Sequence, residues 1–132
     1  METIKVFVYG TLRKGCSNHH VIERYIVESQ PFQVTGRLYD VGFYPALVLD
    51  ERETIRVQGE LVTVHAEALK SIDFLEGYEG PESKFNLYER VLHPEGFYVY
   101  TWSQKKVDEK GLKQIISGDW VAYWKQKKEK IS

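Results

Sequence analysis

The chain has 132 residues, a length typical of one domain with one hydrophobic core, so we expect residues 1–132 to form a single domain. It carries 18 basic and 19 acidic residues, for a formal net charge of −1. This balance excludes a general positive field for nucleic acid or anionic lipid. One cysteine, an amino terminus without a secretion-signal pattern, and no apolar run of the roughly 20 residues that span a bilayer predict a cytoplasmic protein without a membrane partner.

The start of the chain predicts a strand, a glycine loop and a helix. Residues 4–9 are rich in β-branched and aromatic types, as in a buried strand, and Gly10 ends them. Ser17 or Asn18 would cap a helix whose apolar positions at 21, 22, 25 and 26 share one face. The loop between them is therefore expected to join a strand to a helix N-terminus.

The rest of the chain predicts more strands than helices. Strands are expected over residues 32–38, 46–49, 55–61, 87–92 and 97–102, the last two as a hairpin, and helices over 65–75 and 118–130. Gly36 and Gly59 inside strands indicate bulges or close backbone approach in a curved sheet. About six strands with two or three helices do not fit a βαβ alternation. We predict an α+β fold, a small curved mixed β-barrel flanked by two or three helices.

The loop that begins at Gly10 matches a phosphate-binding loop only in part. The stretch GTLRKGCS has the glycine spacing of a P-loop, but Cys16 stands where that mechanism requires a lysine. The chain also lacks the alternating architecture in which P-loops occur. Nucleotide hydrolysis is therefore disfavoured.

A second possibility at this loop is a metal or thiol site at Cys16, Asn18, His19 and His20. Zinc requires four well-spaced ligands, and only two other histidines are present in the chain. A lone thiol at a helix N-terminus can gain thiolate character, but a structural cysteine is the simpler interpretation. We expect no metal site.

Carboxylates gather at the end of the predicted helix over 65–75, in the stretch DFLEGYEG. Asp73 and Glu76 are three residues apart on one helix face, where exposure to solvent is the simplest interpretation. Glu79 lies beyond Gly77 and can point inward, where aromatic surroundings would suit a carboxylate to general base catalysis. A plain loop glutamate is the alternative.

Several short motifs, taken in order, resemble the gamma-glutamylcyclotransferase-like (AIG2-like) family. They are YGTLR at 9–13, NH at 18–19, GFYPA at 42–46, LEGYE at 75–79 and YER at 88–90. Their order and rough spacing extend over nearly the whole chain. The opening motif is most similar to the gamma-glutamylamine cyclotransferase branch.

This resemblance implies an enzyme of transferase or lyase type that uses no cofactor. Family enzymes release 5-oxoproline from a small gamma-glutamyl substrate, whose own α-amine attacks its γ-carbonyl. The resemblance implies that Tyr9, Gly10, Thr11 and Leu12 hold the glutamyl portion and that Glu79 moves the proton.

The residue chemistry agrees with that mechanism. Cyclisation within one molecule needs no external nucleophile, metal or cofactor, and the backbone N–H groups of a glycine loop suit an oxyanion or carboxylate better than a triphosphate. Tyr44 and Tyr88 would wall the pocket and donate hydrogen bonds, or would be core tyrosines.

Two non-enzymatic alternatives remain at this point. One is a binding module that holds a gamma-glutamyl or related amino-acid ligand without turnover, and the other is a structural protein whose glycine loop is only a turn. A Glu79 that faces a cavity favours the enzyme, whereas an exposed or ion-paired Glu79 favours the alternatives.

Overall fold

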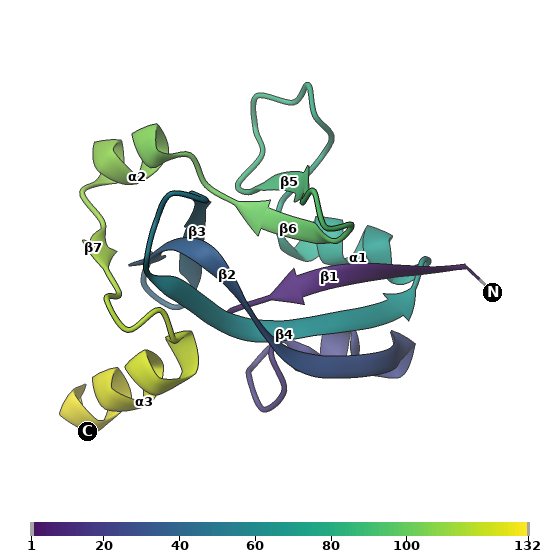
Figure 1. Ribbon diagram of the computed structural model, residues 1–132, viewed down its shortest axis with the longest axis horizontal. Helices are drawn as coiled ribbons and strands as arrows, with labels where there is room; N and C mark the ends of the chain where they lie inside the picture. Colours follow the sequence, from purple (N-terminus) through teal and green to yellow (C-terminus); the bar gives the residue numbers. More distant parts are fainter. Residues whose placement is uncertain (1, 132) are drawn as a thin grey trace.

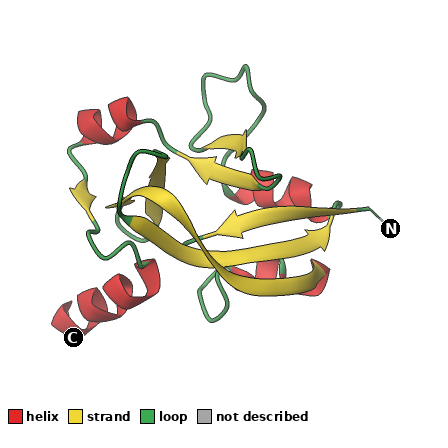
Figure 2. Ribbon diagram, viewed as in Figure 1, coloured by secondary structure: helices red, strands yellow, loops and turns green. Residues whose placement is uncertain are grey.

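The computed structural model describes residues 2–131, which form seven strands, three α-helices and two short 3-10 segments. Figures 1 and 2 show their arrangement. In chain order they are β1 (Thr3–Val8), η1 (His19–Val21), η2 (Glu23–Tyr25), β2 (Ile26–Asp40), β3 (Pro45–Leu49), β4 (Arg56–His65), α1 (Ala68–Leu75), β5 (Glu89–Leu92), β6 (Tyr98–Thr101), α2 (Gln104–Lys110), β7 (Lys113–Gln114) and α3 (Trp120–Ile131). No helix in this described part is long and apolar enough to cross a membrane.

The strands form one mixed sheet in the order β3-β2-β4-β1-β6-β5, with β7 added beside β2. Strands β1 and β6 are parallel, and the other pairs among residues 2–131 are antiparallel. The predicted hairpin is confirmed, because β5 and β6 pair across the short connection at 93–97. The mixed sheet and its helices confirm the predicted α+β class.

Strand β2 curls the sheet because its two halves pair with different partners. Residues 26–35 pair with β4, whereas residues 36–40 pair with β3. Strand β3 is thereby carried round to the end of β6, where the Trp102 N–H donates to the carbonyl of Leu47 at 3.0 Å (Figure 1). The sheet is a half-barrel, in agreement with the predicted curvature.

Two glycines permit the close contacts that this curl requires. A Cβ on Gly59 would lie 2.3 Å from the carbonyl oxygen of Val8, and a Cβ on Gly36 would lie 2.5 Å from that of Val48. Real Cβ atoms do not approach backbone oxygens so closely, so both positions exclude a side chain. The predicted close backbone approach is confirmed at both.

The C-terminal half of strand β1, residues 6–8, is buried on both faces. Val6 and Val8 pack in a cluster with Ile22 of the short connection after η1 and with Ile72 of α1. Phe7 points the other way, into a cluster that contains Trp120 of α3. Each fully buried apolar side chain of this kind stabilises the fold by roughly 1.5–3 kcal/mol. The loop after β1 therefore begins from a strand that is fixed on both sides.

The helix predicted after Asn18 is wrong. The segment forms two 3-10 turns, closed by bonds such as the Val21 N–H to the carbonyl of Asn18 at 3.0 Å and the Tyr25 N–H to that of Ile22 at 2.8 Å. Strand β2 already begins at Ile26, which the periodicity had placed in the helix. Three of the four apolar positions are β-branched, a type that strands accept better than helices do.

Helix α2 and strand β7 were not predicted. Helix α2 buries one apolar residue, Val107, so it has almost no apolar stripe to detect. The residues at its two ends are nevertheless of the types that commonly cap helices. The Ser103 side chain accepts a hydrogen bond from the Lys106 N–H, and Gly111 ends the helix in the left-handed conformation at φ 60°.

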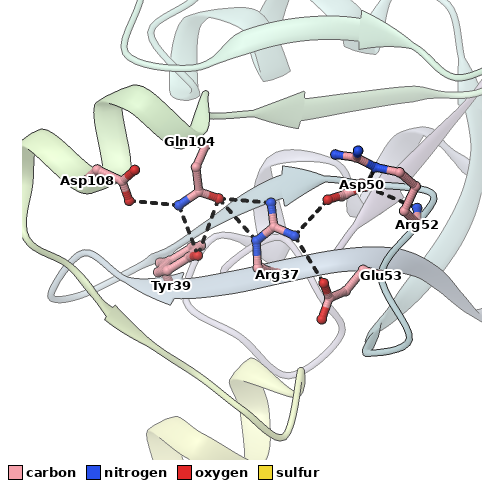
Figure 3. A network of polar contacts seen from close by, with 7 residues as sticks. All are labelled: Arg37, Tyr39, Asp50, Arg52, Glu53, Gln104 and Asp108. Atoms are coloured by element: carbon pink, nitrogen blue, oxygen red, sulfur yellow. Dashed lines mark hydrogen bonds and ion pairs between the residues drawn. The ribbon is translucent and has the colours of Figure 1, made fainter.

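Arg37 attaches α2 to the sheet through a polar network (Figure 3). Its guanidinium donates to Gln104 Oε1 at 2.9 and 3.1 Å, to Asp50 Oδ2 at 2.9 Å and to Glu53 Oε2 at 3.1 Å. The hydrogen bond from Arg37 lowers the pKa of Asp50 to about 2. All of these residues lie outside the cavity described next, so we assign the network a structural role.

Candidate active site

A cavity of about 320 Å³ opens at the C-terminal end of β1. Its walls come from the loop after β1, from the turn between β2 and β3, from the C-terminal end of α1, and from residues 87–88 before β5. These four segments are far apart in the sequence and meet because the half-barrel brings the ends of β1 and β3 together. All six residues predicted to bind substrate line this cavity, namely Tyr9, Gly10, Thr11, Leu12, Tyr44 and Tyr88.

The loop after β1 presents hydrogen-bond donors. Among residues 2–131, no group accepts a hydrogen bond from the backbone N–H of Gly10, Thr11 or Leu12. Their carbonyls are occupied instead, by the Arg13 N–H at 3.1 Å, the Asn18 N–H at 2.9 Å and His19 Nδ1 at 2.9 Å. The loop can therefore donate to an oxyanion or carboxylate. Because the predicted helix is absent, these donors belong to the loop itself and not to a helix N-terminus.

Asn18 holds Thr11 at two points. Its backbone N–H donates to the Thr11 carbonyl, and its side-chain Nδ2 donates to Thr11 Oγ1, both at 2.9 Å. Because Oγ1 accepts from Asn18, the hydroxyl proton of Thr11 remains available to a bound molecule. The sequence suggested two roles for Asn18, as a helix cap or as a metal ligand. In the structure its hydrogen bonds go to the loop instead.

Gly10 is buried against the opposite wall. A Cβ at this position would lie 2.8 Å from both Cγ and Cδ of Pro45. The carbonyl of Pro45 in turn accepts a hydrogen bond from the Tyr88 hydroxyl at 2.6 Å. The absence of a side chain at Gly10 thus sets the spacing between the two walls of the cavity.

Glu76 brings a carboxylate into the cavity. It ends α1, with its N–H bonded to the carbonyl of Ile72 at 2.9 Å and its own carbonyl accepting from the Tyr88 N–H at 3.3 Å. No described residue donates a hydrogen bond to its carboxylate. Burial raises the pKa of Glu76 to about 7. A carboxyl group with such a pKa is suited to exchange protons at neutral pH.

The predicted inward placement of Glu79 is wrong, and the exposed position that was expected to favour a non-enzymatic protein is the one observed; the carboxylate that faces the cavity is Glu76 instead. Its side chain is exposed, lies outside the cavity lining and accepts a hydrogen bond from Ser83 Oγ at 3.0 Å. The chain turns at Gly77, where φ is 65°, so the last helical turn points Glu76 inward and the loop carries Glu79 outward. The sequence pattern had treated Glu76 as part of an exposed helix face, although its side chain is partly buried.

Most tyrosine hydroxyls in the cavity wall already donate hydrogen bonds to other groups of the protein. Tyr9 donates to the carbonyl of Tyr100, Tyr88 to that of Pro45, and Tyr100 to Asp73. Burial raises the pKa values of Tyr9, Tyr88 and Tyr100, so these hydroxyls are neutral. Tyr88 is therefore a wall residue with an occupied hydroxyl. No described residue binds the Tyr44 hydroxyl, which leaves it free for a ligand.

The groups for other chemistries lie apart from the cavity. Burial raises the pKa of Cys16, which does not line the cavity. Residues 2–131 contain no group of three or more His, Cys, Asp or Glu side chains that could hold a metal. Arg13 points away, to Glu60 at 3.0 Å and Asp119 at 3.2 Å. Within the described lining, Glu76 is the only charged side chain.

Comparison with known proteins shows the family of this chain. Residues 6–122 match the family model described as "Gamma-glutamyl cyclotransferase, AIG2-like". The chain is 41% identical over 87 residues to the gamma-L-glutamyl-butirosin B gamma-glutamyl cyclotransferase of Niallia circulans, which covers 65% of this chain and 54% of the relative. It is 32% identical over 122 residues to the gamma-glutamylcyclotransferase family protein YtfP of Escherichia coli K12, covering 89% and 96% of the two chains. The chain thus spans about half of the Niallia relative and nearly all of YtfP.

Solved structures share the fold. The crystal structure of YkqA from Bacillus subtilis aligns with a TM-score of 0.67 at 24% identity, over 97% of this chain and 43% of that one. An AIG2-like protein from Mus musculus aligns with a TM-score of 0.52 at 25% identity, over 80% and 82%. The curled sheet and its helices are therefore an architecture already known from experiment.

Proposed function

The chain belongs to the gamma-glutamyl cyclotransferase, AIG2-like family of enzymes, and we propose that its cavity releases 5-oxoproline from a gamma-glutamyl amine or gamma-glutamyl amino acid. The observation that carries this proposal is the meeting of two groups in one cavity. Glu76 supplies a carboxyl with a pKa near neutrality, and the loop at 10–12 supplies a row of unoccupied backbone donors. Cyclisation requires a proton carrier and an oxyanion site of this kind.

In the proposed reaction, the substrate's α-nitrogen forms a bond to its γ-carbon, and the bond from that carbon to the leaving nitrogen breaks. The substrate enters as an ammonium and leaves as a lactam N–H, so its nitrogen loses two protons. The leaving amine gains those two protons and departs as an ammonium. No water, metal or redox partner enters this balance, because both reacting groups belong to one molecule.

Glu76 is the proposed proton carrier. Its carboxylate takes the first proton from the ammonium, which frees the lone pair for attack, and then gives it to the leaving nitrogen. The ring nitrogen loses its second proton by the same route after the attack. A carboxyl group with a pKa of about 7 both accepts and returns protons readily at neutral pH.

The loop at 10–12 is the proposed binding site for negative charge. The N–H groups of Gly10, Thr11 and Leu12 would bind the substrate carboxylate or the oxyanion that forms on the γ-carbonyl. The Thr11 hydroxyl, held by Asn18, adds one more donor. Tyr9 and Tyr88 contribute the walls that fold the glutamyl chain toward attack geometry, and Tyr44 adds a free hydroxyl.

The direct test is to incubate the purified protein with a panel of gamma-glutamyl amines and gamma-glutamyl amino acids and to measure 5-oxoproline. Release of 5-oxoproline together with the free amine in equal amounts supports the enzyme. Tight binding of a panel member without turnover would favour the binding module instead. Absence of both would reject the proposed site.

The pH dependence provides a second test of Glu76. Its carboxylate must be ionised in the free enzyme to take a proton, so kcat/KM is expected to rise about tenfold per pH unit below pH 7 and to level off above it. The measurement is the initial rate at low substrate concentration between pH 5 and 8.5. A midpoint near the ordinary carboxyl value would show that burial of Glu76 does not control the reaction.

A further inference from the structure

The mouth of the cavity is apolar. Phe43 and Leu87 both line it, yet their side chains are 81% and 37% exposed. Each therefore has one side toward the cavity and another toward solvent. An apolar group that covers them would remove apolar area from water, worth roughly 25 cal/mol per Å².

Phe43 is held in place although it is exposed. Its ring packs edge-on against Trp124 of α3 with centroids 6.0 Å apart, and Trp124 stacks on the buried Trp120 at 5.3 Å. The turn that carries Phe43 is fixed by the Gly42 N–H to Asp40 Oδ1 at 2.7 Å. The ring is therefore a preformed surface, supported from α3, at the entrance to the site.

Charge at this mouth disfavours a second carboxylate. No Lys or Arg of the described chain lines the cavity, and the two nearby lysines are engaged elsewhere. Lys127 Nζ donates to Asp40 Oδ2 at 2.9 Å and to the Gly42 carbonyl at 3.2 Å. Lys106 donates to the Leu87 carbonyl and lies over the Trp102 ring. A carboxylate on the leaving group would meet the charge of Glu76 without a free cation to pair with.

We propose that the preferred substrates are gamma-glutamyl amides of amines that carry an aromatic or alkyl group and no carboxylate beside the nitrogen, and that Phe43 determines this preference. This inference rests on the proposed function, because the glutamyl portion occupies the loop at 10–12 and the amine portion extends to the mouth. The loop donors satisfy one carboxylate, that of the glutamyl portion, and the apolar mouth accepts the rest.

Three synthetic substrates test the preference. Gamma-glutamyl-phenethylamide has the aromatic group, gamma-glutamyl-phenylalanine adds a carboxylate to the same skeleton, and gamma-glutamyl-methylamide lacks the aromatic group. We expect kcat/KM for 5-oxoproline release from the phenethylamide to exceed each of the others by tenfold or more, which corresponds to about 1.4 kcal/mol of transition-state stabilisation. Equal values for the phenethylamide and the methylamide, or a faster reaction with the phenylalanine compound, would overturn the inference.

A pair of variants tests the role of Phe43. Phe43→Ser is expected to reduce the ratio of phenethylamide to methylamide kcat/KM about tenfold. Phe85→Ser is the matched control, since Phe85 is 86% exposed and does not line the cavity, and it should leave that ratio unchanged. An unchanged ratio in Phe43→Ser, or an equal fall in both variants, would refute the assignment. If none of the three compounds releases 5-oxoproline, the proposed function fails as well, whereas turnover without preference refutes only this inference.

Discussion

Glu76→Gln is expected to lower 5-oxoproline release by two or more decades, and Glu79→Gln is expected to stay within a few-fold of the parent rate. Glutamine keeps the size of the side chain but cannot take up the proton of the substrate ammonium, and general acid–base catalysis is typically worth 10²–10⁴ in rate. Glu76 lines the cavity, whereas Glu79 is exposed and contacts Ser83. The measurement is kcat for both variants at pH 8.

The two variants control for each other, because they make the same chemical change three residues apart. Thermal melts at pH 8 should show that both remain folded. A large loss in Glu79→Gln with a near-normal rate in Glu76→Gln would reassign the carboxylate. Normal rates in both would remove the proton-transfer mechanism proposed above.

The free energy of unfolding tests the raised pKa of Glu76 without relying on turnover. Burial raises the pKa of Glu76 from its ordinary value of 4.5 to about 7, so the folded state prefers the protonated form. The associated stability is fully present below pH 4.5 and is lost as the pH rises through 7. Glu76→Gln removes this loss and is expected to be more stable than the parent at pH 8 by about 3 kcal/mol, measured by urea unfolding.

The sheet could be predicted because strand patterns dominate this sequence. Arg56, Gln58 and Glu60 alternate with apolar residues in β4, and Gly59 in the same strand marks a real close contact with Val8. The motif YGTL could be placed on a loop after a buried strand, since Gly10 follows an unbroken apolar run. The predictions that rested on alternating polar and apolar residues, and on a glycine that ends an apolar run, were therefore confirmed.

Elements with weak apolar patterns could not be predicted in the same way. Helix α2 buries Val107 alone and depends on polar contacts from Gln104 to Arg37, which join residues 67 positions apart. The apolar residues after Asn18 have helical spacing, but the last of them, Ile26, is the first residue of strand β2. Strand pairing overrode the local helical periodicity at Ile26, whereas α2 had no apolar periodicity to detect.

The carboxylate of the site was misplaced for a geometric reason. The direction of the last side chain of a helix depends on the rotation of the whole helix about its axis, which is set by the side chains that pack against the sheet. Ile72 fixes α1 against the sheet, and Glu76 lies one turn later on the same side. Because i and i+4 share a face, the burial of Ile72 was the available signal that Glu76 faces inward.

Gly10→Ala is expected to lower kcat/KM by tenfold or more and to lower the melting temperature as well. Two explanations are open for this loss, namely obstruction of the bound substrate by the new methyl group and a clash within the protein itself. The new Cβ would lie 2.8 Å from Cγ and Cδ of Pro45, atoms of a stiff ring. Overpacking of this kind typically costs roughly 1–3 kcal/mol and moves the backbone, here the loop that carries the free N–H groups of Thr11 and Leu12.

The double variant Gly10→Ala with Pro45→Ala separates the two explanations. Replacing Pro45 removes the Cγ and Cδ atoms that the new methyl group would meet, and Pro45→Ala alone gives the reference rate and melting temperature. If the clash with Pro45 causes the loss, the double variant should recover most of both quantities relative to that reference. Recovery of the melting temperature without recovery of kcat/KM would show that the substrate itself approaches Gly10. Recovery of neither would show that the loop cannot accept a side chain for a reason other than Pro45.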